Sequence, residues 1–400
     1  MLVYHTDVQA EEFRALVKAV VEDGRALDRA EARSVLAMLL DASTAPLSAS
    51  SANSSANSSA NELPPALEMP LAALLAAMAQ RGETAEELCG FAEAMRGAAT
   101  PIPLDDNERA RLVDTCGTGG DGLDTLNIST AAGLVAAGAG ASIAKHGNRA
   151  VTSRCGSADV LEALGVPIRL APAQAAACLR ETGFMFLLAV SLHPAMRRVG
   201  PVRRALPFRT IFNLTGPLAN PAGAAAQVVG VYAEERIPMV AEALRLLGTR
   251  HAWVVHGRVE HGLGEVGSER GLDELSVTGE SVWAAVQDEQ VRPGVLWPES
   301  LGLRLASLAE LRGGANAREN ARLIEAILRG EDRGARREIV LLNAGAALVV
   351  GGLAPTLGEG LERAAEAVDS GAALGVLQRL RAFGLAQEKS ETNGDAPVSA

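Results

Sequence analysis

A glycine-rich turn followed by hydroxyl and amide side chains occupies residues 114–130, which read DTCGTGGDGLDTLNIST. Its glycines, at positions 117, 119, 120 and 122, allow positive φ angles, and successive N–H groups in such a turn can converge on an anion. A helix-compatible run follows, so Asn127, Ser129 and Thr130 stand where a helix begins and where side chains cap it or contact an anion. By itself, the turn is more typical of an ordinary strand–turn–helix joint, because it matches neither the Walker pattern nor GxGxxG.

A lysine and an arginine follow the small-residue helix. Lys145 comes directly after a predicted short strand at 142–144, and a buried ammonium needs a partner, which a phosphate supplies. Arg149 either binds a phosphate or carboxylate group or forms an internal salt bridge to Asp159 or Glu162. Together with the glycine turn, these cations favour a polyphosphate site.

Nine motifs then occur in one order over nearly the whole chain: GTGGDG, TLNIST, AKHGNR, GSADVLEALGV, HPAM, PVRRAL, RTIFNLTGPLANP, GLDELS and LLNAGAAL. In these motifs the chain resembles the anthranilate phosphoribosyltransferases, which join anthranilate to phosphoribosyl pyrophosphate (PRPP) in tryptophan biosynthesis. Nine motifs in register make the resemblance specific, although each one alone would be weak.

The resemblance implies a binding site for each reactant and for Mg²⁺. The PRPP site would comprise Gly117, Thr118, Gly119 and Gly120 around the pyrophosphate, Asp121 near the sugar phosphate or a metal-bound water, Thr125, Asn127, Ser129, Thr130 and Lys145 at the phosphates, with Gly147 and Ser157. The anthranilate site would comprise Arg203 as the carboxylate binder, with His146, Asn148, His193 and Gly216. The magnesium ligands would be the pair Asp273 and Glu274 for one ion and Ser129 for the other.

Adjacent carboxylates in a loop suit Mg²⁺, which takes one or two carboxylates together with phosphate oxygens. Without the phosphate motifs, Asp273 and Glu274 would be interpreted as a solvated helix start. The displacement at C1 of the ribose passes through an oxocarbenium-like state, so we expect electrostatic positioning by Lys145 and Arg203 and assign no catalytic nucleophile or strong general base.

The expected fold is α/β: a small all-helical domain, a large α/β domain with a mainly parallel central sheet, and the active site in the cleft between them. Helical spacing, with capping boxes at Asp28 and Thr84, predicts helices in residues 1–108, completed by about 194–216. Apolar runs such as RLVDTCG, ASIAKHG, GFMFLLAV, AQVVGVYA and HAWVVHG predict strands in the second domain, at 109–193 and 217–386. A Ser/Asn-rich insert at 43–61 and a tail at 387–400 are expected to be disordered.

The composition of the chain narrows the class of protein further. The 400 residues carry a net charge of −11, which disfavours a general nucleic-acid binder. Because the chain is acidic, binding a polyanion requires it to concentrate its cations locally and to recruit a metal ion. Four cysteines without metal-site spacing suit a reducing cytoplasm, and no signal peptide is visible. A homodimer through the helical domain is expected. Two alternatives remain, a pyrimidine nucleoside phosphorylase-like enzyme and a non-catalytic nucleic-acid-binding relative.

The chain departs from the family pattern at four places: Leu126 replaces an aromatic residue, Cys155 a small hydroxyl residue, Pro207-Phe208 a glycine, and residues 258–270 form an extended stretch beside the acidic pair. We expect these departures to affect details of packing and of the pockets.

Overall fold

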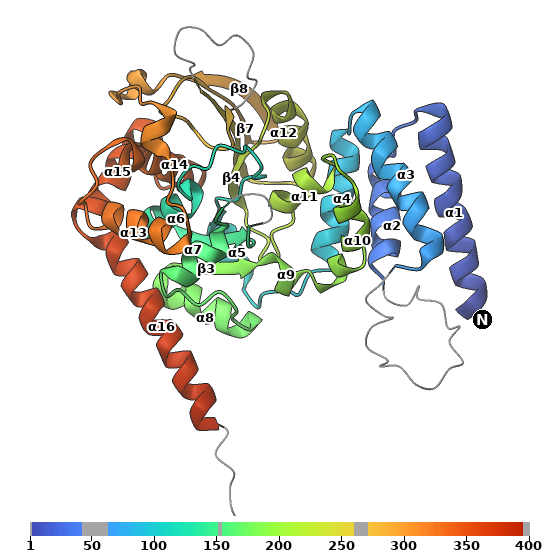
Figure 1. Cartoon of the computed structure of the whole chain (residues 1–400), viewed down its shortest axis with the longest axis horizontal. Helices are drawn as coiled ribbons and strands as arrows, with labels where there is room; N and C mark the ends of the chain where they lie inside the picture. Colours follow the sequence, from blue (N-terminus) through green and yellow to red (C-terminus); the bar gives the residue numbers. More distant parts are fainter. Residues whose placement is uncertain (1, 42–62, 151–153, 260–270, 395–400) are drawn as a thin grey trace, which may run out of the picture. The chain divides into compact units, whose positions relative to one another are not determined.

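The computed structural model describes residues 2–41, 63–150, 154–259 and 271–394 (Figure 1). Two compact units result: unit 1 is Met1–Thr100, Val190–Pro221 and Glu242–Gly248, and unit 2 is Pro101–Ala189, Ala222–Ala241 and Thr249–Ala400. The predicted insert at 43–61, and the stretch at 258–270 except for its first two residues, lie outside the described residues. None of the helices within the described ranges is both long and apolar enough to span a membrane.

Unit 1 is helical. Its principal elements are α1 (Leu2–Asp23), α2 (Arg29–Leu40), α3 (Pro65–Arg81), α4 (Ala85–Gly97), η3 (Pro194–Arg197), α10 (Gly200–Ala205) and α11 (Phe212–Leu218), with α9 (Ala189–Leu192) at its border. The predicted capping boxes are confirmed, because Asp28 and Thr84 each accept a hydrogen bond from the backbone N–H three residues later. Helices α2 and α4 pack against each other at Gly90, where a side chain would collide with the backbone of Arg29.

Unit 2 contains the central sheet. Its strands are β1 (Leu112–Asp114), β2 (Ser142–Gly147), β3 (Phe184–Leu188), β4 (Ala226–Gly230), β5 (His251–Arg258), β6 (Gly271–Leu272), β7 (Ser281–Gln287) and β8 (Gln290–Leu296). Within the described ranges the order is β3-β2-β1-β4-β5-β7-β8, with β6 paired to β5. The first five strands are parallel and the rest antiparallel. The five predicted strands and the mainly parallel sheet are therefore confirmed.

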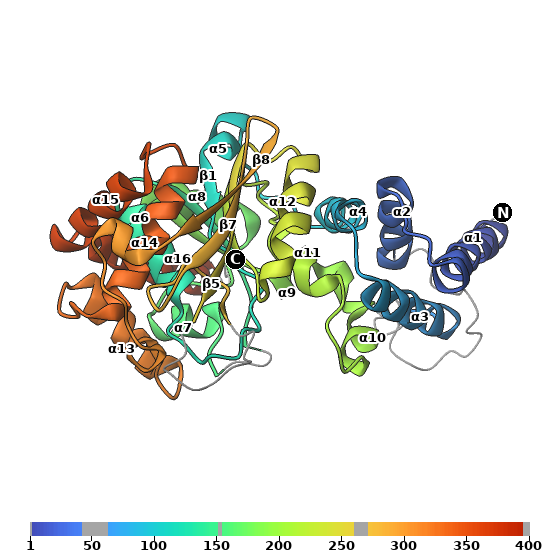
Figure 2. The ribbon, with the colours of Figure 1, turned by 90° about the horizontal axis from the view of Figure 1, so that it is seen from above.

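The remaining helices belong to unit 2. They are α5 (Asp106–Arg111), α6 (Ile128–Gly138), α7 (Ser157–Ala163), α8 (Pro172–Thr182), η4 (Glu234–Arg236), α12 (Ile237–Leu246, which continues into unit 1), η5 (Pro298–Leu301), η6 (Leu308–Leu311), α13 (Ala317–Leu328), α14 (Ala335–Val350), α15 (Leu357–Asp369) and α16 (Ala372–Gly394). Figure 2 shows α6, α14 and α15 grouped on one side of the sheet, and α14 contacts β1, β4 and β5. Leu126 and Cys155 are 3 % and 8 % exposed in this apolar core, so the core accommodates both departures.

Several boundaries differ from the prediction, since unit 1 also includes residues 190–193, 217–221 and 242–248. Residues 101–108 belong to unit 2 and not to the helical unit, because Arg109 donates to the carbonyls of Ile102 and Ala222 (2.8 and 2.7 Å) and ties this segment to the α/β unit. The predicted tail from residue 387 is wrong at its start, since α16 continues through Gly394. Gln174 Nε2 donates to Gln387 Oε1 (3.0 Å), which fixes the helix beyond its last apolar turn.

Candidate functional site

The glycine turn joins β1 to α6 in unit 2. Its positive φ angles fall at Gly119 (66°), Gly120 (81°), Gly122 (71°) and Asp124 (51°), so the three glycines occupy a conformation that side chains disfavour. Thr118 anchors the turn to the end of β4, because its N–H donates to Gly230 O (2.8 Å) and its Oγ1 accepts from Tyr232 N (3.1 Å). The turn is therefore held in a conformation in which successive backbone N–H groups can converge on an anion.

The acidic pair occupies these backbone donors. Gly119 N donates to Asp273 Oδ2 (2.7 Å), and Ser129 N, in the first turn of α6, donates to Glu274 Oε1 (2.9 Å). A carboxylate thus lies in the turn and another at the helix N-terminus, both places that favour anions. The turn residues predicted to bind PRPP and the acidic pair predicted to bind magnesium are therefore brought together by direct hydrogen bonds.

Lys145 is the buried cation of this cluster. It lies within β2, which extends through Gly147 and not only to residue 144 as predicted, and it is 2 % exposed. Its Nζ donates to Thr115 O (3.0 Å), Thr115 Oγ1 (3.3 Å) and Ser129 Oγ (3.1 Å). The ammonium is therefore fixed beside the start of α6.

Three carboxylates, those of Asp121, Asp273 and Glu274, belong to the same cluster as the Lys145 ammonium. Burial, followed by repulsion from Asp121, raises the pKa of Asp273 to about 7. Burial and then repulsion from Asp273 raise the pKa of Glu274 to about 8, although Lys145 opposes the change, and burial also raises the pKa of Asp121. The excess of negative groups makes this a favourable place for a cation.

The donor set fits Mg²⁺. The described residues contain no group of three or more His, Cys, Asp or Glu side chains arranged as metal ligands. The two carboxylates of Asp273 and Glu274 match an ion that takes one or two protein carboxylates and completes its shell with phosphate oxygens and water, and the Ser129 hydroxyl is the oxygen predicted for a second such ion.

The segment after β2 borders the same cluster. Asn127 Nδ2 donates to Cys155 O (2.9 Å), while in the described chain its buried Oδ1 receives no hydrogen bond. A side chain at Gly147 would collide with Ser157 Oγ and come within 2.8 Å of the Phe186 ring, so the glycine is required for close packing. Ser157 Oγ in turn donates to Asn148 O (3.2 Å).

Other members of the predicted set are engaged elsewhere. Arg149 forms the internal salt bridges, to Asp159 (2.8 Å) and Glu162 (2.9 Å). His146 is buried, and its backbone N–H donates to Asp114 Oδ1 (3.1 Å). Thr130 is buried within α6. Thr125 forms an isolated bridge with Arg312.

The predicted anthranilate residues of unit 1 have different environments. Arg203, on α10, is exposed and lies 4.8 Å from the centre of the Phe212 ring, and the described residues offer it no carboxylate partner. His193 is buried against the backbone of Met95 and Ala219, and burial lowers its pKa. Gly216 lies in α11, with nothing within 4 Å of the position a Cβ would take. Arg203 is therefore the cation of this group available to a carboxylate.

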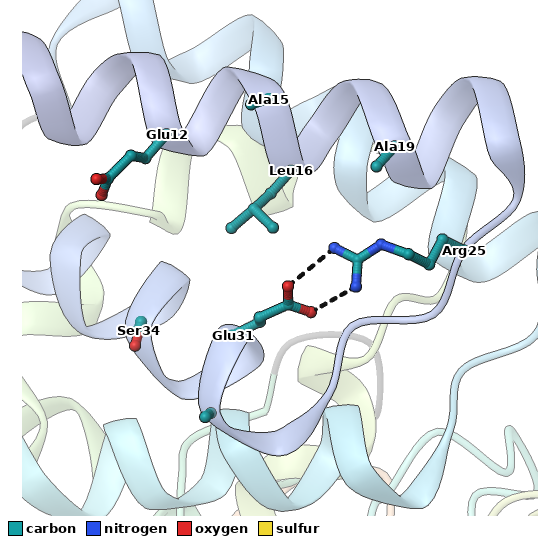
Figure 3. A pocket seen from close by; sticks show the side chains of 8 residues that line it. Glu12, Ala15, Leu16, Ala19, Arg25, Glu31 and Ser34 are labelled. Atoms are coloured by element: carbon teal, nitrogen blue, oxygen red, sulfur yellow. Dashed lines mark hydrogen bonds and ion pairs between the residues drawn. The ribbon is translucent and has the colours of Figure 1, made fainter.

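A separate depression of about 500 Å³ lies between α1 and α2 (Figure 3). Leu16 and two alanines of α1 face it, and the Arg25–Glu31 ion pair (2.7 Å) closes one side. None of the predicted site residues lines it, so it has no part in the site.

Sequence analysis missed the residues that hold the acidic pair. Asn343 of α14 exchanges two hydrogen bonds with the backbone of Leu275 (2.9 Å each). Side chains at Gly230 and Gly257 would collide with the carbonyl oxygens of Asp273 and Glu274. The one available signal was Asn343 itself, a polar residue inside an apolar run.

Comparisons with known proteins identify the family of the chain. Residues 109–374 match the family described as glycosyl transferase family, a/b domain, and residues 14–99 match its helical bundle domain. The anthranilate phosphoribosyltransferase of Rubrobacter xylanophilus is 50 % identical over 77 % of this chain and 85 % of its own length. The crystal structure of the Thermus thermophilus enzyme has a TM-score of 0.77 at 40 % identity and covers 92 % of this chain and 98 % of that one. The Saccharomyces cerevisiae enzyme in complex with PRPP and Mg has a TM-score of 0.78 at 25 % identity, covering 94 % and 98 %.

Proposed function

The chain belongs to the anthranilate phosphoribosyltransferase family, and on that premise we propose how its residues transfer the phosphoribosyl group of PRPP to the amino group of anthranilate. The products are N-(5-phosphoribosyl)anthranilate and pyrophosphate, in a step of tryptophan biosynthesis. The observation that carries the assignment of residues is the hydrogen-bonded cluster that joins the glycine turn, Ser129, Lys145 and the acidic pair.

In this proposal PRPP binds at the glycine turn and the start of α6. Backbone N–H groups of Gly119 and Ser129, which now donate to Asp273 and Glu274, turn to phosphate oxygens. The displaced carboxylates become ligands of Mg²⁺, which neutralises charge on the pyrophosphate leaving group. Lys145 contributes a fixed positive charge, and Asn127 Oδ1 is available as an acceptor for a ribose hydroxyl.

Anthranilate binds through Arg203. A guanidinium stacked on the Phe212 ring keeps its N–H edges directed outward, which suits a planar carboxylate and leaves an aromatic surface beside it. Exposed Phe208, in the departure at 207–208, lies on the segment that follows α10 and borders this group in sequence. We propose that Gly216 leaves room for the anthranilate ring.

The chemical step requires little beyond positioning. The C1–O bond to pyrophosphate breaks with its electron pair going to the pyrophosphate, and the lone pair of the amino nitrogen forms the C1–N bond. The nitrogen then loses a proton to solvent. Because an aniline-type nitrogen attacks in its neutral form, no residue is assigned as a general base, and the chain acts by orienting both reactants and stabilising charge.

The test follows the loss of anthranilate fluorescence in the presence of PRPP and Mg²⁺. Arg203→Ala is expected to raise the KM for anthranilate about 10- to 100-fold, since a charged hydrogen bond contributes about 1.5–3 kcal/mol. Its neighbour on α10, exposed Arg204, gives the matched control Arg204→Ala, which should change this KM less than twofold. An unchanged anthranilate KM in Arg203→Ala would refute the acceptor site. Phosphorolysis of a pyrimidine nucleoside in place of anthranilate consumption would refute the reaction.

We also propose that the enzyme is a homodimer assembled through the helical unit. Val21 and Met69, on α1 and α3, are 51 % and 76 % exposed, an apolar surface that a second copy would cover. Light scattering should then give twice the chain mass, and Met69→Glu should reduce it. A cytoplasmic location is proposed because all four cysteines are free thiols.

A further inference from the structure

Asn343 is a buried amide inside an apolar helix. It lies in the middle of α14 and is 3 % exposed, among neighbours such as Leu342 and Ala344 that are fully buried. Burying an amide is costly unless its polar atoms are hydrogen-bonded. The position therefore calls for specific partners.

Those partners belong to the chain directly after the acidic pair. Asn343 Oδ1 accepts from Leu275 N and Asn343 Nδ2 donates to Leu275 O, both at 2.9 Å. Nδ2 also donates to Ile339 O, one turn earlier in α14 (2.9 Å). The side chain thus binds both polar groups of one residue, as a neighbouring strand would, and the contact to Ile339 fixes the amide's own orientation.

The acidic pair has no regular secondary structure of its own to hold it. Strand β6 ends at Leu272, and Asp273, Glu274 and Leu275 follow it. Their backbone is confined on one side by Gly230 and Gly257, where any side chain would collide with the carbonyl oxygens of Asp273 and Glu274. Asn343 adds an attractive contact to the backbone of this segment, at Leu275, and α14 is itself packed on β4 and β5.

We propose that Asn343 is a positioning residue for the magnesium-binding carboxylates. It acts through the backbone of Leu275 and holds Asp273 and Glu274 where they can bind the turn N–H groups in one state and a metal ion in the other. This inference rests on the proposed role of the acidic pair. Residues behind metal ligands commonly change metal affinity by about 10- to 100-fold when they are replaced.

The test compares Asn343→Leu with the wild-type chain. Binding of Mn²⁺ as a probe is measured by electron paramagnetic resonance with PRPP present and without turnover, and Mg²⁺ half-activation is measured in the steady state. We expect both constants to rise about 10-fold or more, with the KM for anthranilate unchanged. Asn343→Ser, which is smaller and still polar, gives the same direction if the leucine variant does not fold.

Thr182→Val is the matched control. Thr182 is also buried (2 % exposed), and its hydroxyl also joins backbone groups, donating to Cys178 O (2.7 Å) and accepting from Phe184 N (3.2 Å), away from the acidic pair. It should lower the thermal midpoint without changing Mn²⁺ binding. The same pattern in the Asn343 variants, lower stability with an Mn²⁺ dissociation constant within twofold of wild type, would overturn the inference. A wild-type chain that binds Mn²⁺ but does not consume anthranilate would instead overturn the proposed reaction, and the Mn²⁺ comparison would still decide the role of Asn343.

Discussion

Asp273→Asn should stabilise the metal-free protein at pH 8 while impairing its function. The pKa of Asp273 is raised from 3.8 to about 7, mainly by burial. As the pH rises, the unfolded chain therefore loses this proton at a lower pH than the folded state does. The folded state binds more protons between about pH 4 and pH 7, so the free energy of unfolding falls as the pH rises through that window. The difference of about three pH units corresponds to about 4 kcal/mol at pH 8. Because the Asp273 residue is only half-buried and water still screens part of its charge, we expect about half of this, ~2 kcal/mol.

Thermal unfolding in EDTA measures this effect. The gain of Asp273→Asn should be about 2–3 °C at pH 8 and less than half of that at pH 5. The amide can still accept the hydrogen bond from Gly119, so its geometry is preserved. Glu280→Gln is the control: it removes a carboxylate that pairs with Arg258 (2.8 Å) and should give no gain. A variant that is no more stable at pH 8, or whose advantage grows as the pH falls, would refute the electrostatic reasoning.

Three further predictions concern Lys145, a pair of glycines and the metal ion. Lys145→Met should raise the KM for PRPP about 10- to 100-fold and leave the KM for anthranilate nearly unchanged, because the fixed positive charge beside the start of α6 is lost; equal changes in both constants would contradict this. Gly147→Ala should cost about 1–3 kcal/mol in urea unfolding, since its Cβ would collide with Ser157 and lie 2.8 Å from the Phe186 ring. Gly216→Ala, with open space around its Cβ, should cost less than about 0.5 kcal/mol, and equal losses in the two glycine variants would contradict the packing described. Removing Mg²⁺ with EDTA should abolish turnover and its re-addition should restore it, whereas residual turnover in EDTA would argue against a metal requirement.

Much of the fold could be predicted because buried strands and capped helix starts leave patterns in the local sequence. The five parallel strands were visible as short apolar runs, and the capping boxes as spaced side chains. The β7–β8 hairpin was missed because Asp288 and Glu289 take positive φ (51° and 59°) in its turn, where the usual signal is Asn-Gly or Asp-Gly. Pro293 within β8 also disfavoured a strand, and the sheet tolerates it at its edge.

The candidate site divides in the same way. The glycine turn, Lys145 and the acidic pair were identified by residue type and by resemblance. The contacts of Asn343 with Leu275 are tertiary, between residues 68 positions apart, and no local sequence pattern predicts them. For Arg149 the sequence left a phosphate contact and a salt bridge equally open, and the structure shows the salt bridges.

The most direct test of the central claim measures anthranilate loss and pyrophosphate release in the same reaction, with PRPP and with or without Mg²⁺. The proposed displacement predicts one pyrophosphate released for each anthranilate consumed, and neither change without the metal. Pyrophosphate release that does not depend on anthranilate, or anthranilate consumed without pyrophosphate, would contradict the account.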